Sequence, residues 1–236
     1  VRVCMSAQEA GLNLKGTLFL VTGETLTEQK RKEIEAVGAR PVPVYGISEA
    51  GVIAAGCPQK HAGPDHCHVY KDTTAIVHHK QEVALTGAEV NSYLFTSLLY
   101  EAPKLLLNVG MGDHGELKKE SCGCAFGEIG FDTHIWNIRS YEKLTGEGVT
   151  FVDTDFVEII EKELPERFGG QSTDYQLTEE EDEKGFNRLR LIISPRLGDI
   201  DENKVMETFI DLLKKSERSP ESWAQSGSEM WNQARM

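Results

Sequence analysis

The chain has 236 residues, of which 39% are hydrophobic and 27% charged, and its formal net charge is −13. This composition is typical of a globular protein, and the length accommodates one large domain or two smaller ones. The negative charge argues against a nucleic-acid binder, and the absence of an apolar run near ~18 residues or of a signal-peptide pattern at Val1 argues against a membrane protein.

The first elements predict a strand–helix–strand unit. Gly16–Val21 is an apolar run typical of a buried strand, and Glu28–Val37 has helical spacing with Thr25 or Thr27 as its N-cap. A second strand over Ala39–Val44 follows and is expected to end in a turn. Two strands joined by one helix are typical of a βαβ unit, so we expect a parallel sheet in this α/β part of the chain.

Short β-type runs separated by Gly, Pro or Asn come after Gly56. Their pattern predicts a small antiparallel sheet or distorted barrel. The runs are Val69–His79, Ser92–Tyr100, Lys104–Val109, Glu116–Lys119 and Ile129–Ile138.

The rest of the chain predicts a small α+β domain. We expect a helix over Phe156–Leu164 that stops at Pro165, and a second helix over Asp201–Lys215 with Asp201 as its cap. Between them, Tyr175–Leu177 and Leu189–Ile193 have the pattern of paired strands. We therefore place the domain boundary between residues 139 and 140, with domains over 1–139 and 140–236.

Four short motifs with nucleotide-binding chemistry occur in order along the chain. They are Gly23-Glu24, Tyr45-Gly46-Ile47-Ser48-Glu49, Gly110-Met111-Gly112-Asp113 and Arg139-Ser140. The Ser48 hydroxyl can bind a phosphate oxygen, and Glu49 can ligate Mg²⁺, which prefers carboxylate and phosphate oxygens. The Tyr45 ring offers a flat face to a base, and the Asp113 carboxylate can accept both hydrogens of a ribose diol.

This ordered set resembles the adenylate-forming enzymes, in particular the phenylacetate–coenzyme A ligase branch, from about Lys15 to about Leu213. The resemblance implies that the chain forms the end of a parallel-sheet nucleotide-binding domain with its β-subdomain, followed by a mobile lid domain. It implies ATP or AMP and Mg²⁺ as cofactors, a small carboxylic acid as substrate (an aryl acid by analogy) and coenzyme A as acceptor. The implied residues are Ser48 and Glu49 for catalysis, and Gly23, Glu24, Tyr45, Gly46, Asp113 and Arg139 for the nucleotide.

The resemblance covers the later half of such an enzyme. The sequence has no Gly/Ser/Thr-rich phosphate loop ending in Lys and no C-terminal Gly-Lys, and it starts without Met. We therefore expect a fragment that does not complete adenylation by itself. In the family, the segment after Arg139 is a hinge, where Glu142 takes the place of an acid.

Two alternatives stay open. One is a relative with an acceptor other than coenzyme A. The other is a zinc-stabilised scaffold without catalysis, which is kept open by the departures from the usual family residues at Gly110-Met111 and Tyr141. A homodimer is also left open.

The cysteines and histidines form a separate signal. Five cysteines without a secretory mark predict reduced thiols and a cytoplasmic location. Thiolates and imidazole favour Zn²⁺, and Cys122-Gly123-Cys124 presents two thiolates from one turn. Some members of the resembling branch carry zinc on a Cys, a His and a Cys-x-Cys, which implies Cys57, His68, Cys122 and Cys124 here. His61, His66 and Cys67 remain alternatives.

Overall fold

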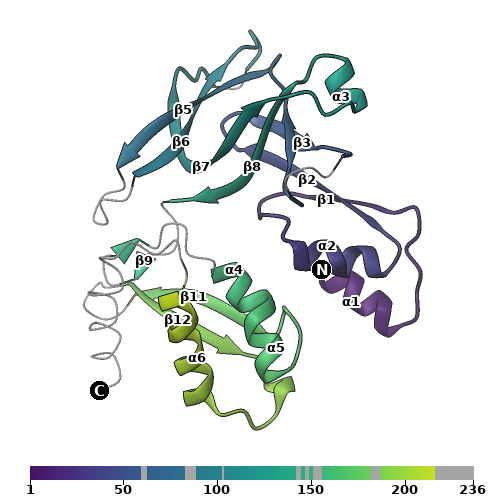
Figure 1. The fold of residues 1–236 in the computed structure, drawn as a ribbon, viewed down its shortest axis with the longest axis vertical. Helices are drawn as coiled ribbons and strands as arrows, with labels where there is room; N and C mark the ends of the chain where they lie inside the picture. The colour runs from purple at the N-terminus through teal and green to yellow at the C-terminus, as the bar shows by residue number, and fades with distance from the viewer. Residues whose placement is uncertain are drawn as a thin grey trace. The chain divides into compact units, whose positions relative to one another are not determined.

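The computed structural model describes residues 1–59, 63–82, 89–102, 104–141, 145–146, 149–150, 156–181 and 187–215 (Figure 1). These residues fall into two compact units. The first lies within 1–81 and 90–139, and the second contains Glu82, Glu89 and the described residues from Ser140 onward. None of the described helices combines the length and the apolarity needed to cross a lipid bilayer.

One eight-stranded mixed sheet organises the first unit, in the order β1-β2-β3-β4-β8-β7-β6-β5. The strands β1 and β2 are parallel, whereas β2–β3, β3–β4, β4–β8 and β6–β7 are antiparallel. The expected βαβ unit is confirmed, but the antiparallel strands continue the same sheet instead of forming a separate one. The elements are α1 (Arg2–Glu9), β1 (Leu18–Val21), α2 (Glu28–Ala36), β2 (Arg40–Ile47), β3 (Gly51–Gly56), β4 (Cys67–Val69), β5 (Thr74–Glu82), β6 (Glu89–Ser97), β7 (Val109–Lys119), α3 (Ala125–Glu128) and β8 (Thr133–Ser140).

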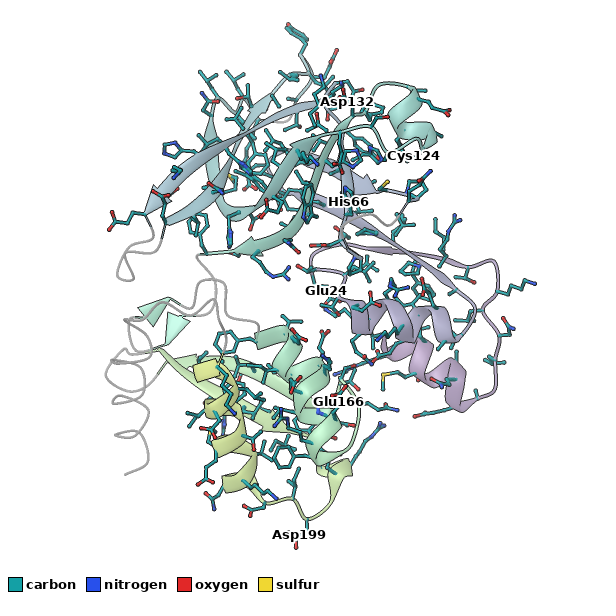
Figure 2. The ribbon with its side chains drawn as sticks, viewed as in Figure 1. Glu24, His66, Cys124, Asp132, Glu166 and Asp199 are labelled. Atoms are coloured by element: carbon teal, nitrogen blue, oxygen red, sulfur yellow. The ribbon has the colours of Figure 1, made fainter. Side chains whose placement is uncertain are left out.

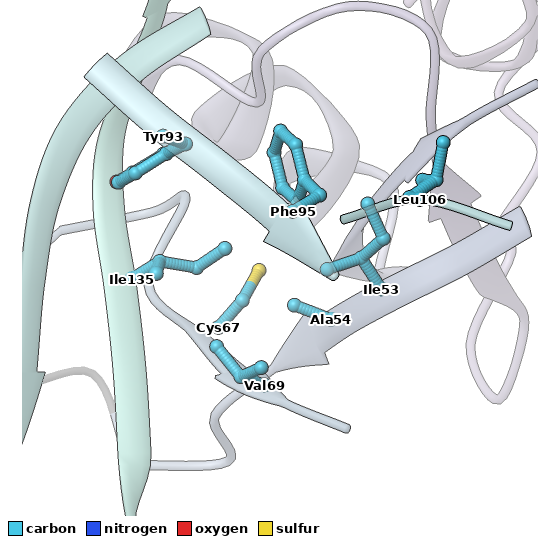
Figure 3. Close-up of a cluster of buried hydrophobic side chains, with 8 residues drawn as sticks. All are labelled: Ile53, Ala54, Cys67, Val69, Tyr93, Phe95, Leu106 and Ile135. Atoms are coloured by element: carbon cyan, nitrogen blue, oxygen red, sulfur yellow. The ribbon is translucent and has the colours of Figure 1, made fainter. Parts of the chain in front are cut away.

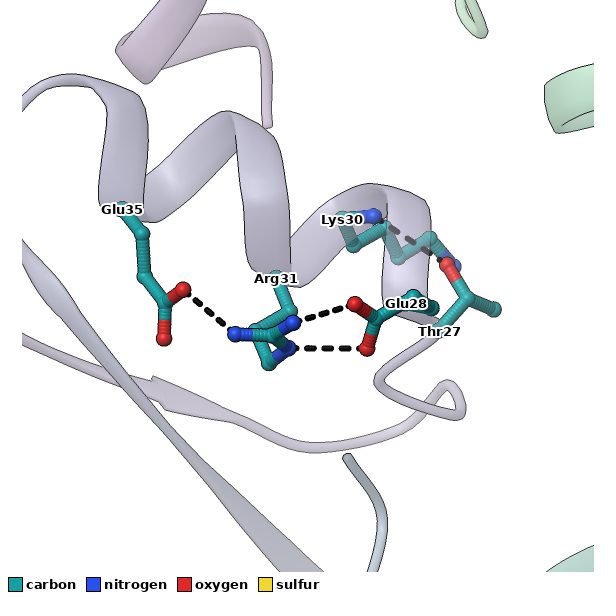
Figure 4. A network of polar contacts seen from close by, with 5 residues as sticks. All are labelled: Thr27, Glu28, Lys30, Arg31 and Glu35. Atoms are coloured by element: carbon teal, nitrogen blue, oxygen red, sulfur yellow. Dashed lines mark hydrogen bonds and ion pairs between the residues drawn. The ribbon is translucent and has the colours of Figure 1, made fainter. Parts of the chain in front are cut away.

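Helix α2 has the polar termini that its sequence predicts. The Thr27 hydroxyl accepts a hydrogen bond from the Lys30 N–H at 3.2 Å, which satisfies a free backbone donor of the first turn. On the exposed face, the Arg31 guanidinium bridges Glu28 and Glu35 one turn either side (Figure 4). Three residues after Arg31, the Ile34 side chain is buried in a core cluster that also contains Cys4 of α1.

The core of the antiparallel part comes from residues that lie on several strands (Figure 3). The buried side chains are Ile53, Ala54, Cys67, Val69, Tyr93, Phe95, Leu106 and Ile135. Cys67 packs here, with its Sγ 3.9 Å from the Pro43 carbonyl oxygen. Since side chains alternate across a strand, His68 must face away from this core.

Two predicted elements of this unit differ from the structure. The run Lys104–Val109 is a loop up to Asn108, because the Ser97 hydroxyl donates to the Lys104 carbonyl at 2.8 Å and accepts from the Leu106 N–H at 3.1 Å. Asn108 then adopts a left-handed backbone, with φ of 50°. The run Val69–His79 is also interrupted, because turn residues separate β4 from β5.

The second unit has the predicted α+β composition. Strands β11 (Tyr175–Glu181) and β12 (Asn187–Ile193) are antiparallel, with Tyr175 opposite Ile193. They contribute to a core with α4 (Phe156–Glu158), η1 (Ile159–Glu163), α5 (Leu164–Phe168) and α6 (Glu202–Lys215). Asp201 caps α6 as expected, accepting from the Lys204 N–H at 3.1 Å. The remaining elements are β9 (Thr145–Gly146), which pairs with β10 (Val149–Thr150), and the 3₁₀ turn η2 (Pro195–Leu197).

The sequence analysis expected the first helix of this unit to stop at Pro165, but the helix continues past this residue. The helical segment continues through α5 to Phe168, and η1 before the proline is a π-helical turn in which the Leu164 N–H donates to the Ile159 carbonyl. A proline inside a helix lacks a donor and crowds the carbonyl four residues earlier. The wider π-helical turn relieves that crowding, so the helix continues past the proline.

Candidate functional site

The segment Tyr45–Glu49 runs from strand β2 into the turn that precedes β3. Tyr45, Gly46 and Ile47 belong to the strand, and the turn starts at Ser48, later than the sequence analysis placed it. The pairing of β2 with β3 shifts register between Tyr45 and Gly46. A Cβ at Gly46 would lie 2.7 Å from the Gly51 carbonyl oxygen, so only glycine allows this close crossing.

Ser48 and Glu49 lie at the accessible end of this segment. Ser48 is exposed, and the Glu49 carboxylate lies 3.6 Å from the Lys104 ammonium in an ion pair. The Lys104 side chain is 61% exposed, so it can move into water when a stronger cation approaches the carboxylate. The turn therefore presents a hydroxyl and a carboxylate side by side in the chain.

Tyr45 and Asp113 meet although 68 residues separate them. The Tyr45 hydroxyl donates to an Asp113 carboxylate oxygen at 2.7 Å. Burial, followed by the Asp113 charge, raises the pKa of Tyr45, which keeps the phenol protonated as a donor. The motif Gly110-Met111-Gly112-Asp113 is consistent with a turn in sequence, but the whole motif lies inside strand β7.

Gly23, Glu24 and Arg139 are connected through the end of strand β8. Gly23 has a φ of 79° in the β1–α2 loop, where Glu24 pairs with Lys30 at 2.9 Å. The next residue of that loop, Thr25, donates its hydroxyl to the Ile138 carbonyl at 3.2 Å, and the Arg139 guanidinium donates to the same oxygen at 3.0 Å. The first motif and the Arg139 backbone are thus held at one point.

A buried carboxylate, Asp65, orients this strand end. It accepts a hydrogen bond from the Ile138 N–H at 3.2 Å and lies 3.9 Å from the Arg139 guanidinium. Burial raises the pKa of Asp65, while the Ile138 N–H and the Arg139 charge oppose that rise. Sequence reasoning did not identify Asp65, because nothing local distinguishes it from a loop aspartate.

Strands β7 and β8 carry Asp113 towards Arg139. The Glu120 N–H donates to the Asp132 carbonyl at 2.8 Å, and a Cβ on Gly115 would lie 3.0 Å from the Asn137 carbonyl. Residue numbers fall along β7 as they rise along β8, so the strands are antiparallel. The same pairing, continued by two residues, leads from Gly115 to Asp113 and from Asn137 to Arg139.

The cysteines and the histidine that the sequence analysis selected converge on one point. Atoms of Cys57, His68, Cys122 and Cys124 that can bind a metal all lie within 4.8 Å of one another. The His68 Nε2 atom is 3.6 Å from the Cys122 Sγ and 3.1 Å from the Cys124 Sγ. Tetrahedral Zn²⁺ with bonds of ~2.1 Å to nitrogen and ~2.3 Å to sulfur spaces its ligand atoms by about 3.4–3.8 Å. The 3.6 Å separation matches this spacing and the 3.1 Å separation is slightly shorter, so the residue types and positions suit one zinc ion.

The imidazole of His68 is already in the tautomer that a metal needs. Its Nδ1 lies 2.6 Å from the Phe131 carbonyl oxygen, and a carbonyl only accepts, so Nδ1 carries the proton and Nε2 keeps its lone pair. Burial lowers the pKa of His68, which also favours the neutral ring. The Phe131 segment is held by the next residue, Asp132, which is labelled in Figure 2. The Asp132 carboxylate binds the Lys71 ammonium at 2.6 Å and the Lys119 ammonium at 3.2 Å. The hydrogen bond from Lys71 lowers the pKa of Asp132 to about 2. Desolvation opposes this change, and the hydrogen bond from Lys119 adds to it.

The thiols of the set show why a cation suits it. Burial raises the pKa of Cys57 to about 12. A hydrogen bond from the Gln59 N–H opposes this rise, and the nearby Cys122 and Cys124 sulfurs add to it. At Cys124 burial acts in the same direction, but N–H groups of Gly127 and Phe126 and the neighbouring thiols lower the pKa overall. Three adjacent thiolates repel one another, so all three thiols ionise only when a cation is bound. Binding of the cation therefore releases protons.

The alternative ligands lie elsewhere. Cys67 faces the core described above, and His66 belongs to a different cluster with Glu120 and His134. His61 lies outside the described residues, as does Glu142 of the expected hinge. Neither Glu120 nor His134 was identified from the sequence, where they occur far apart among ordinary strand residues.

Comparison with known proteins found no matching family model and no matching curated protein. Among solved structures, a variant of E. coli MenE with bound OSB-AMS aligns with 84% of this chain at 11% identity, with a TM-score of 0.46. Wild-type E. coli MenE with an analogue of OSB-AMS aligns with 98% of the chain at 12% identity and a TM-score of 0.42. A Brucella canis acyl-CoA synthetase aligns with 90% at 16% identity and a TM-score of 0.40. The chain spans 39%, 49% and 40% of these proteins, respectively.

Proposed function

We propose that the chain is the later half of an ATP-dependent ligase that activates a carboxylic acid as its acyl-adenylate and transfers the acyl group to coenzyme A. The observation that carries the proposal is the hydrogen bond between Tyr45 and Asp113. It joins, across the sheet, the two motif residues with the chemistry for a base and for a ribose diol. The Gly23-Glu24 loop and Arg139 are tied to the end of β8, towards which Asp113 lies.

Each motif residue has a role that its position permits. The Tyr45 ring supports adenine while its hydroxyl orients Asp113, and Asp113 accepts from the ribose hydroxyls. Arg139 offsets phosphate charge, and the exposed Ser48 hydroxyl binds a phosphate oxygen. Glu49 would hold Mg²⁺ in place of the Lys104 ammonium, and the ion would offset charge on the phosphates.

The Cys57, His68, Cys122 and Cys124 set holds a structural Zn²⁺ in this proposal. Four protein ligands complete a tetrahedral shell, which leaves no open position for substrate and is typical of structural zinc. Three aromatic rings pack against one another beside this set, with centroids 5.8–6.4 Å apart; they belong to Tyr70, Phe126 and Phe131. The ion would tie β4 and the segment after β3 to the α3 turn.

Binding of AMP to the chain tests the nucleotide site directly. Replacing Asp113 by Asn should weaken AMP binding about 10–100-fold, because hydrogen bonds to a charged acceptor contribute ~1.5–3 kcal/mol. Tyr45→Phe keeps the ring and removes the hydroxyl, so its loss should be smaller, about fivefold. Isothermal titration calorimetry with AMP measures both values.

Asp72→Asn is the matched control for this series, since Asp72 is an exposed aspartate on the turn after β4. It should bind AMP like the unmodified chain. Equal affinity in Asp72→Asn and Asp113→Asn, or no AMP binding by the unmodified chain at millimolar concentration, would contradict the proposed site.

A zinc-stabilised scaffold without catalysis is the second candidate. It is favoured by the completeness of the Cys/His set within the chain and by Gly110-Met111, which replace residues usual in the resembling family. The AMP titration separates the two candidates, because a scaffold keeps the metal site without nucleotide affinity.

We also propose that the two compact units reorient about the segment that follows Arg139. Each unit has its own buried core, and the division falls between Arg139 and Ser140. Limited proteolysis should therefore cut first between Ser140 and Gly148, and mass spectrometry of the fragments locates the cut. First cleavage inside β7 or α6 would count against a hinge at this position.

A further inference from the structure

A second group of metal-binding side chains lies beside the cysteine set. It consists of His66, Glu120 and His134, whose ligand atoms all lie within 4.8 Å of one another. None of the three has a role in the nucleotide or structural-zinc proposals. His66 is labelled in Figure 2.

The strand geometry explains why these residues meet. Strands β4 and β8 are antiparallel with His68 opposite His134, and His66 lies two residues before His68, so both imidazoles of this segment share one face. The His134 ring lies 4.7 Å from His66 and 4.2 Å from His68, centroid to centroid. Glu120 joins them because its N–H donates to the carbonyl of Asp132, two residues before His134.

The burial and charge of the group suit a divalent cation. His66 and His134 are almost fully buried, at 2% and 0% exposure, while the Glu120 side chain keeps 27% exposure and gives access from solvent. The Glu120 carboxylate now pairs with Lys118 at 2.7 Å, so it already binds a cation in this position. The Lys118 side chain is 62% exposed and can withdraw into water.

We propose that His66, His134 and Glu120 form a second Zn²⁺ site, separate from the cysteine set, with two imidazoles and one carboxylate as ligands. Imidazole and carboxylate are both ordinary zinc ligands, and three protein ligands leave a fourth position for water. The absence of sulfur makes this site harder and weaker than the cysteine site. Lys118 competes with the ion for Glu120, so metal binding displaces the lysine.

Cobalt and zinc titrations of the metal-free 236-residue chain test the proposal. The first equivalent of Co²⁺ should produce intense sulfur-to-cobalt charge-transfer absorption, and a second equivalent should add only the weak visible bands of nitrogen and oxygen ligands. Equilibrium dialysis against Zn²⁺ with elemental analysis should likewise give two equivalents. Glu120→Gln should weaken the second equivalent by about tenfold or more and leave the charge-transfer band unchanged.

Two further variants separate a ligand role from a structural role of Glu120. Glu116 is an exposed glutamate on strand β7, which ends one residue before Glu120, and Glu116→Gln should keep both equivalents. Lys118→Ala removes the cation that competes for Glu120, so this variant should bind the second equivalent of metal at least as tightly as the unmodified chain. If Glu120 served only the ion pair with Lys118, the variant would gain no metal affinity. Saturation by thiolate-bound metal alone, or a second equivalent that persists undiminished in Glu120→Gln, would overturn the proposal.

Discussion

Removal of zinc from the Cys57, His68, Cys122 and Cys124 set should lower the melting temperature of the chain by roughly 8–16 °C. Metal present at 1,000 times its dissociation constant stabilises the folded state by about 4 kcal/mol, and each kcal/mol corresponds to about 2–4 °C in a chain of this size. The loss should be large because the proposed ion would join segments that are distant in sequence, from β4 to the turn before α3. Scanning calorimetry with and without a strong chelator measures it.

Single substitutions locate the ligands. Cys122→Ser should lose the zinc of this set and should melt at the same temperature with and without chelator. Cys67→Ala is the informative control, because Cys67 is the neighbouring alternative ligand and packs in the core. It should keep its zinc and its sensitivity to chelator, although loss of packing lowers its stability. Loss of zinc in Cys67→Ala would show that the ligand set is wrong. The same would follow if a variant without the thiols of Cys57, Cys122 and Cys124 still showed sulfur-to-cobalt charge-transfer absorption.

Under the proposed function, replacing Glu49 by Gln should reduce ATP–pyrophosphate exchange by the full-length protein about 10²–10³-fold, the usual loss for one electrostatic contact to a transition state. The amide retains the size of the side chain but holds Mg²⁺ poorly. The melting temperature should stay near that of the unmodified protein. Glu49 lies on a surface turn and pairs only with a mostly exposed lysine among the ion pairs described, and such substitutions change stability by within ~0.5 kcal/mol.

Lys104→Ala is the matched control for this prediction. It breaks the same ion pair from the other side and leaves the carboxylate in place, so exchange should change by no more than a few-fold. A similar loss in both variants would assign the effect to the ion pair. Unchanged exchange in Glu49→Gln would place the nucleotide site elsewhere and favour the scaffold candidate.

Several features of this protein follow from local sequence patterns. The helix periods of α2 and α6, the Thr27 and Asp201 caps and the alternation in β11 and β12 all correspond to observed elements. Such features depend on side chains within one or two turns of each other, so a short window contains the whole cause. The chemical types of the motif residues are likewise visible in the sequence.

The expectations that failed concern segments whose conformation depends on distant partners. Lys104–Val109 has the composition of a strand, but Ser97 forms hydrogen bonds with its backbone, and Leu106 is its only fully buried side chain. Pro165 has the composition of a helix stop, but the packing of Leu164 and Ile159 in the second core maintains the helix through a π turn. Hydrogen bonds from a distant serine outweigh local propensity in the first segment, and burial of apolar side chains outweighs it in the second.

The sequence by itself determined which side chains can bind a nucleotide or a metal, because donor and acceptor chemistry belongs to each residue. The sequence also implies that His66 and His68 share a strand face and that Cys67 has the other. The tertiary structure decided which face meets Cys122 and Cys124, which histidine joins Glu120 and His134, and that Tyr45 of β2 meets Asp113 of β7. Those outcomes depend on the pairing of β4 with β8 and on the position of β7 in the sheet, and strand pairing joins residues that no local pattern relates.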